Sequence, residues 1–176
     1  DNGVLYLASG ELADLEKGAI YALRQLPNGD FEPPVLMAVG FRRATGILYA
    51  YDSLYVSSRG VITRLRDTDG DLVADETEEL ITGLPFGIFG VKGQATEHQT
   101  QSMRVGPDGR IYVIQGVTTD RSPVTQKYEG TIFSMFEDGS DVQEYAYGFR
   151  NPFDIDFNAN GDMFTADNSA NVKPDE

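Results

Sequence analysis

The sequence contains no cysteine, and its 176 residues include one histidine, His98. The absence of cysteine excludes a disulfide scaffold, a thiolate metal site and a thiol nucleophile. The chain also lacks an apolar run of the roughly 18 residues that a membrane-spanning helix requires, so we predict no membrane span. Acid–base chemistry on an imidazole would therefore have to use His98, although an ordinary surface histidine is the alternative.

Basic residues are scarce: 14 Lys and Arg stand against 28 Asp and Glu, for a net charge of -14. Such a surface repels phosphate backbones and anionic membranes, which makes nucleic acid an unsuitable partner. It suits divalent cations or basic electron-transfer partners, and it also serves solubility. A content of 40% hydrophobic residues predicts a globular chain rather than a disordered one.

The first residue is Asp1 rather than a methionine. We therefore expect a processed or trimmed chain from which any signal peptide has already been removed.

The most informative feature is an internal repeat built around an aromatic strand. Its four copies occupy residues 1–7, 51–56, 108–113 and 160–165, and their aromatic residues are Tyr6, Tyr55, Tyr112 and Phe164. They recur at intervals of roughly 50 residues, a period that suits four strands and their turns. We name these four strands A to D, with B carrying the aromatic residue.

Each copy continues with a strand that begins at a glycine, a polar turn, a further strand and a glycine-containing exit. The exits read Gly40-Phe41-Arg42-Arg43, Gly83-Leu84-Pro85 and Gly148-Phe149-Arg150-Asn151-Pro152. Because no sustained helical periodicity competes with this pattern, it predicts an all-β fold.

The predicted architecture is a β-propeller of four-stranded antiparallel blades, of which about three are present. We expect one partial domain over residues 1–176, with blade units at about 1–43, 44–85, 101–151 and 152–176, the last incomplete. A propeller normally needs four to eight blades to close. The chain is therefore expected to be a fragment of a six-bladed ring, completed by further chain or by another subunit.

The order of strands sorts the connections between two faces. In an up-and-down blade the B-to-C and D-to-A connections emerge on one face, and the other two connections emerge on the opposite face. The long connection over 86–101, which carries Glu97 and His98, should share a face with the loop over 115–129 and with Arg150-Asn151. A base, a cation and an amide are thus predicted to converge there.

An acidic loop over 67–78 is predicted to open on the opposite face. It has carboxylates at loop positions 1, 3, 5, 9 and 12, the spacing of a calcium loop, and the carbonyl of position 7 is available. These residues are Asp67, Asp69, Asp71, Asp75, Glu78 and, for the carbonyl, Val73. Leu72 departs from the pattern, because position 6 usually requires glycine. The alternatives are a structural calcium site remote from His98 and a solvated acidic hairpin turn.

Three stretches carry a resemblance to a known family. They read EHQTQSMRVGPDGRIYV, YEGTIFSMFEDGS and YGFRNPFDIDFNANG. Over Glu97 to about Asn168 the chain resembles the soluble quinoprotein glucose dehydrogenases and the related aldose and sorbosone dehydrogenase propellers.

The resemblance implies oxidation of an aldose or related alcohol by hydride transfer to pyrroloquinoline quinone. His98 would be the general base, with the carboxylate of Glu97 beside it, and Arg150 and Asn151 would contact the quinone. Arg150 would also stabilise negative charge that develops on the quinone oxygens. The resemblance further implies a cytochrome or quinone as electron acceptor and a periplasmic or other extracytoplasmic location.

The segment over 167–170 departs from the family, because it lacks the Gly-Pro beside which main-chain oxygens help to hold a catalytic calcium. A second hypothesis is therefore a non-catalytic propeller, serving as a binding platform or structural subunit of a larger extracytoplasmic complex.

Overall fold

The computed structural model describes residues 3–9, 18–87, 100–119, 124 and 126–168. These residues contain strands and turns but no helix, and thus none that could cross a membrane. The predicted base His98 and its neighbour Glu97 lie outside the described residues.

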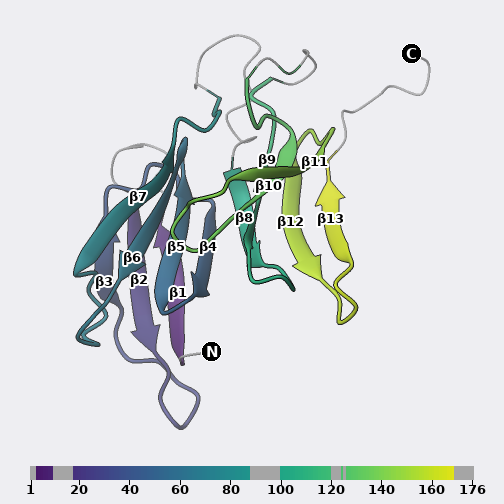
Figure 1. Cartoon of the computed structure of the whole chain (residues 1–176). Coiled ribbons are helices and arrows are strands. Elements are labelled where there is room, and N and C mark those ends of the chain that lie inside the picture. The colour runs from purple at the N-terminus through teal and green to yellow at the C-terminus, as the bar shows by residue number, and fades with distance from the viewer. Residues whose placement is uncertain (1–2, 10–17, 88–99, 120–123, 125, 169–176) are drawn as a thin grey trace.

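The strands form four antiparallel sheets (Figure 1). The first sheet contains β1 (Val4–Ser9), β2 (Ala19–Arg24) and β3 (Val35–Val39). The second contains β4 (Gly46–Ala50), β5 (Ser53–Ser58), β6 (Val61–Arg66) and β7 (Glu76–Thr82). The third contains β8 (Thr100–Val105), β9 (Ile111–Gln115), β10 (Thr131–Met135) and β11 (Gln143–Tyr147). The fourth contains β12 (Pro152–Phe157) and β13 (Met163–Asp167).

Strands in each sheet are neighbours in the order in which they occur along the chain. The four sheets thus correspond to strands B–C–D, A–B–C–D, A–B–C–D and A–B of the repeat. The A strands line one side of the array, where β8 packs against β4 and against β12. The prediction of an all-β propeller with four-stranded antiparallel blades is confirmed.

The glycine that begins each C strand is hydrogen-bonded to the connection that leaves strand D of the same sheet. Backbone carbonyls of Gly18, Gly60 and Gly130 accept the amides of Phe41, Leu84 and Phe149, at 3.0, 3.0 and 3.1 Å. A Cβ on Gly18 would lie 1.7 Å from the Phe41 carbonyl oxygen, and one on Gly130 would lie 2.3 Å from that of Phe149. Only glycine permits so close an approach of two backbone segments.

A bulge follows each of these glycines at the same place. The C-to-D pairing shifts register after Ile20, Ile62 and Ile132, which lie two positions beyond the three glycines. All three isoleucines are buried. A bulge increases the local twist of a strand, so the repeat fixes the shape of each sheet as well as its order.

In the first three sheets, the aromatic residue of the B strand faces the next sheet along the chain. Tyr6 stacks on Tyr49 of β4 with ring centroids 5.5 Å apart, and Tyr112 meets Phe157 of β12 at 5.1 Å. The hydroxyl of the buried Tyr55 donates to the carbonyl of Glu137 in the third sheet at 2.9 Å. These contacts belong to three hydrophobic clusters, each between two successive sheets. Each blade therefore buries its apolar residues against its neighbours.

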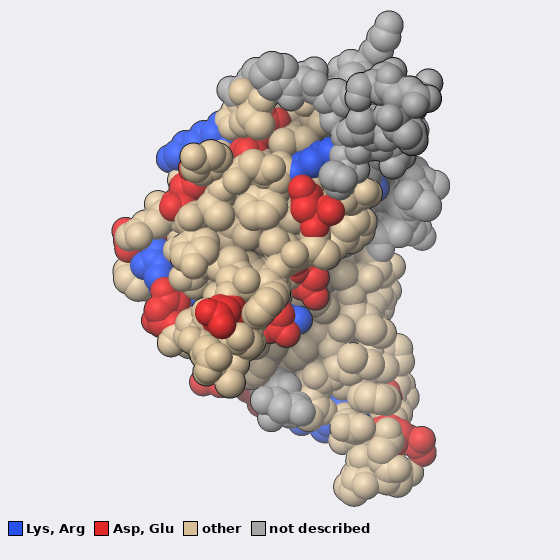
Figure 2. Space-filling view, turned by 90° about the vertical axis from the view of Figure 1, so that its right-hand side faces the viewer, with Lys and Arg blue, Asp and Glu red and all other residues tan. Residues whose placement is uncertain are grey.

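Phe164 is the exception, because it lies on β13 and is 60% exposed. Phe153 is also exposed on this side, and Figure 2 shows an end of the molecule on which charged residues are a minority. Leu5, Leu7 and Leu36 are exposed on the first sheet. We call the side of β12 and β13 that carries Phe164 the forward end face, and the side of the first sheet that carries these leucines the backward end face.

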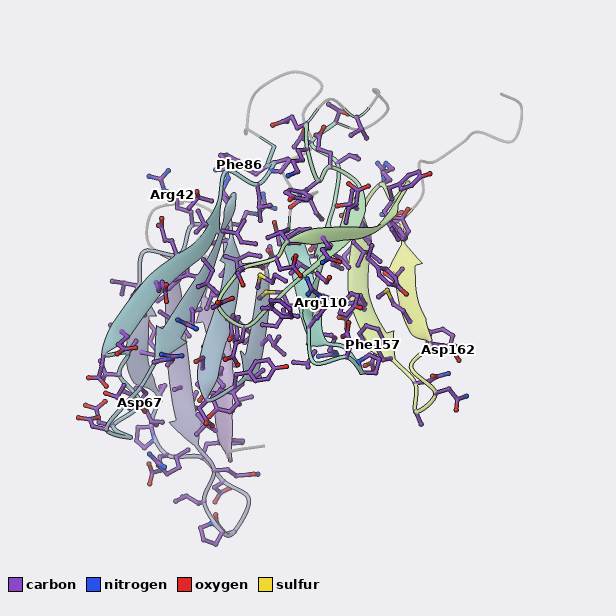
Figure 3. All side chains as sticks on the ribbon, viewed as in Figure 1. Arg42, Asp67, Phe86, Arg110, Phe157 and Asp162 are labelled. Carbon is purple, nitrogen blue, oxygen red and sulfur yellow. The ribbon has the colours of Figure 1, made fainter. Side chains whose placement is uncertain are left out.

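The connections separate between two faces as the strand order requires. We call the end with residues 40–45, 115–119 and 148–151 the upper face, and the end with 51–52, 67–75 and 158–162 the lower face. Arg42 and Phe86 lie at the upper face in Figure 3, whereas Asp67 and Asp162 lie at the lower face.

Replacing Gly18 with Ala tests whether the close approach of these backbone segments holds the blade together. The new Cβ would overlap the Phe41 carbonyl oxygen, so we expect the free energy of unfolding to fall by about 3 kcal/mol. Gly29→Ala is the control, since its Cβ would meet open space and only its positive φ of 90° would be strained, at about 1 kcal/mol. Urea unfolding curves measure both, and equal losses would contradict the interpretation.

Candidate functional site

Arg150 and Asn151 are fixed on the upper face by a carboxylate. They lie between β11 and β12, and Asp167 at the end of β13 accepts the backbone amide of Arg150 at 3.0 Å and that of Asn151 at 2.7 Å. Two bonds from one carboxylate hold both residues in a single backbone conformation. Sequence reasoning did not assign this role to Asp167, because nothing in the B-strand pattern distinguishes a carboxylate that binds backbone amides.

The guanidinium of Arg150 lies against the segment that follows β13. Its Nη1 donates to the carbonyl oxygen of Asn168 at 2.9 Å, and the amide of Asn168 donates to the carbonyl of Asn151 at 3.2 Å. The residue as a whole is half-buried. Its orientation is set by the end of the fourth sheet.

Asn151 is 3% exposed and joins two blades. Its Oδ1 accepts Nε2 of Gln101 at 2.9 Å, while the Gln101 carbonyl accepts the hydroxyl of Ser57 at 3.1 Å. A chain of hydrogen bonds thus runs from β5 across the start of β8 to the start of β12. Arg150 is the more accessible member of the predicted pair, and the burial of Asn151 gives its amide a structural role.

The loop over 115–129 contributes a buried carboxylate to the upper face. Glu129 is 4% exposed and accepts the Thr118 amide at 3.0 Å, the Thr118 hydroxyl, and the amide of Gln126 at 2.9 Å. The amide of Val117 donates to the Arg150 carbonyl at 2.9 Å. The described residues of this loop are therefore held by Glu129 and by the Arg150 turn. In the sequence, the only signal for Glu129 is its position directly before Gly130.

The structure brings three of the predicted calcium ligands together on the lower face. Carboxylate oxygens of Asp67, Asp69 and Asp71 lie within 4.8 Å of one another. Leu72 adopts the positive φ, 70°, that this loop position requires, although it is not glycine. Its side chain is 7% exposed and joins the hydrophobic cluster between the first two sheets. Burial of this side chain offsets the strain of a left-handed leucine.

The other predicted ligands have different partners. Asp75 accepts the amide and hydroxyl of Thr68 at 2.7 and 2.6 Å, and these bonds lower the pKa of its carboxyl. Glu78 lies on β7 and pairs with Arg64 of β6. The predicted ligand of Val73 is its carbonyl, whereas its amide donates to Asp71 at 2.8 Å.

The Arg150 turn offers one charged donor suited to an anionic quinone, the guanidinium of Arg150. A partly buried arginine with a fixed backbone fits a ligand that carries carboxylates. The residue type of Arg150 therefore fits pyrroloquinoline quinone at this position: Arg150 would hold the cofactor, and the buried Asn151 would fix the turn that carries Arg150.

Solved structures with a similar fold include one protein from Coprinopsis cinerea and one from Trichoderma reesei. The pyranose dehydrogenase PQQ domain from Coprinopsis cinerea is 13% identical, with a TM-score of 0.67 over 97% of this chain and 47% of that one. A carbohydrate-active enzyme of family AA12 from Trichoderma reesei is 12% identical, with a TM-score of 0.67 over 97% and 49%.

The calcium-binding protein regucalcin from Agrobacterium tumefaciens is 14% identical, with a TM-score of 0.56 over 88% of this chain and 45% of that one. At such identities the likeness shows the shared fold alone. The chain spans about half the length of these structures.

No curated protein matches the sequence. One family model does match, over residues 29–175, and its description is "Domain of unknown function (DUF7133)". The chain therefore belongs to the DUF7133 family.

Proposed function

We propose that this chain forms part of a quinoprotein oxidoreductase, which oxidises an aldose or related alcohol with pyrroloquinoline quinone as cofactor. The observation that carries the proposal is the Arg150 turn on the upper face, whose two backbone amides bind Asp167 and whose arginine is only partly buried. The shared fold with a pyranose dehydrogenase PQQ domain supports it.

In this proposal each residue of the chain has a distinct task. His98 takes the proton from the substrate hydroxyl, because a neutral imidazole accepts a proton near pH 7. Glu97 supplies a carboxylate beside it, and Arg150 attracts the anionic groups of the cofactor. When bound, the quinone would accept the hydride. A cytochrome or quinone would then take the electrons, in a periplasmic or other extracytoplasmic location.

The second candidate is a non-catalytic propeller that acts as a binding platform or structural subunit. The forward and backward end faces favour it, because they expose the apolar positions that other sheets bury between blades. Another propeller segment or subunit is the partner that these faces fit.

We also propose that the acidic loop binds calcium as a structural ion. The clustered oxygens of Asp67, Asp69 and Asp71 support this, since calcium prefers carboxylate and carbonyl oxygens. The ion would hold the β6–β7 connection on the lower face, remote from the Arg150 turn.

Titration of the full chain with pyrroloquinoline quinone and calcium tests the proposed activity. We expect saturable cofactor binding and dye reduction with at least one member of a sugar panel. His98→Ala should lower turnover at least about a hundredfold if His98 is the general base. Asp162→Asn on the lower face is the control and should keep full activity. Absence of both cofactor binding and dye reduction would leave the platform as the surviving candidate.

Asp167→Asn tests how the Arg150 turn is positioned. Loss of the carboxylate weakens its bonds to the two amides, so we expect about a tenfold weaker affinity for pyrroloquinoline quinone. Asp162→Asn again serves as the control, because the Asp162 carboxylate also accepts a hydrogen bond within one turn, from the Asn158 side-chain amide at 2.8 Å, but on the lower face. An unchanged affinity in a correctly folded Asp167→Asn protein would show that the turn does not bind the cofactor.

Thermal unfolding with calcium or a chelator tests the acidic loop. A bound ion should stabilise the folded chain by about 2.7 kcal/mol when its concentration is a hundred times the dissociation constant. Asp71→Asn should abolish that gain. Asp138→Asn should retain it, since Asp138 caps the corresponding turn of the third sheet through the Ser140 amide at 2.9 Å. If calcium stabilised the unchanged protein, Asp71→Asn and Asp138→Asn equally, a site at Asp71 would be excluded.

A further inference from the structure

A cleft between the first two sheets opens near the upper face. It has a volume of about 350 Å³ and lies between the end of β3, the β5–β6 turn and strands β6 and β7. Its polar lining consists of Arg42, Ser58, Arg59, Thr63, Thr77 and Glu79. None of these residues has a role in the proposed oxidation.

Positive charge gathers at this cleft although the chain as a whole carries a net charge of -14. Burial lowers the pKa of Arg59, and the positive charges of Arg43 and Arg42 lower it further. Three guanidinium groups are thus close enough to repel one another. A negatively charged group placed between Arg42 and Arg59 would reduce this repulsion.

Arg59 is held rigidly at the wall of the cleft. Its Nη2 donates to the Gly87 carbonyl at 2.7 Å, and its guanidinium carbon lies 4.9 Å from the centre of the Phe86 ring. Its backbone amide donates to the Arg42 carbonyl at 3.1 Å. The Nε of Arg59 is buried, and no hydrogen-bond partner for it exists among the described residues. A fixed guanidinium gives up little conformational entropy when it binds a ligand.

The turn that carries Arg42 has the same construction as the turn that carries Arg150. Gly40 and Phe41 donate to the Gly18 carbonyl, just as Gly148 and Phe149 donate to that of Gly130. Gly40 and Gly148 have φ values of 96° and 99°. The repeat therefore presents an arginine at the upper face in two blades.

The remaining polar groups define what else the ligand carries. Ser58, Thr63 and Thr77 offer hydroxyls, which donate to an anion or accept from an alcohol. Glu79, which pairs with Thr63 across β6 and β7, offers only acceptors while ionised. A second anionic group near Glu79 would be repelled, whereas a hydroxyl there would be bound.

We propose that this cleft binds a small hydroxylated anion, whose phosphate or carboxylate group lies between Arg42 and Arg59 and whose hydroxyl groups face Thr63 and Glu79. The volume accommodates a compound of a few carbon atoms. This site does not depend on pyrroloquinoline quinone and would operate in either a catalytic or a non-catalytic propeller.

Calorimetric titration at low ionic strength and pH 7 tests the proposal, with glycerol 3-phosphate and glycerate as probes and glycerol as the neutral control. We expect saturable one-to-one binding of at least one anion and none of glycerol. Preference for one anion identifies the phosphate or the carboxylate as the recognised group. Arg42→Gln and Arg59→Gln should each weaken that binding at least tenfold.

Arg24→Gln is the matched control, because it removes the same charge from an exposed arginine that pairs with Glu32. Its affinity for the anion should be unchanged. Circular dichroism verifies that each variant is folded, and Arg42→Gln alters an exposed side chain, so it remains informative if Arg59→Gln does not fold. The proposal is overturned if neither anion binds saturably, or if Arg24→Gln weakens binding as much as Arg42→Gln.

Discussion

The backbone contact between the start of strand C and the exit of strand D determines much of this structure. In three successive sheets a glycine carbonyl accepts the amide of an apolar residue that begins the next connection. Because the contact lies at the upper face, it fixes where each connection enters the following blade. The Arg42 turn, Phe86 and the Arg150 turn all follow such a contact. A repeated backbone contact thus determines where the candidate sites lie.

The sequence predicted the architecture well because the repeat is a local pattern. Aromatic strands, glycine-led strands and polar turns recur together, so strand order and the division between upper and lower faces could be derived without coordinates. The bulges after Ile20, Ile62 and Ile132 could not, since a shift in pairing depends on the partner strand. The left-handed Leu72 was also unexpected, because its strain is offset by contacts with residues distant in the sequence.

The candidate site was less predictable than the fold. Residue types singled out Arg150 and Asn151, but only the structure shows that Arg150 is partly exposed whereas Asn151 is buried between blades. Asp167 and Glu129 were missed because their partners are backbone amides, which leave no signature in the residue pattern. The acidic loop shows the converse: regular spacing suggested six ligands, yet Glu78 pairs with Arg64 on the adjacent strand. For His98 and Glu97, which lie outside the described residues, the catalytic assignment stays a prediction.

The two end faces have a geometric consequence. Tyr6, Tyr55 and Tyr112 each contact the sheet that follows their own, so the direction from one blade to the next is the same throughout the array. Phe164 continues that direction at one end, while Leu5 and Leu7 stand at the other. The array of sheets therefore has a direction, because its forward end face and its backward end face differ and each would fit the opposite face of another sheet. A further blade, whether from the same chain or from another subunit, can therefore meet each end face in one orientation only.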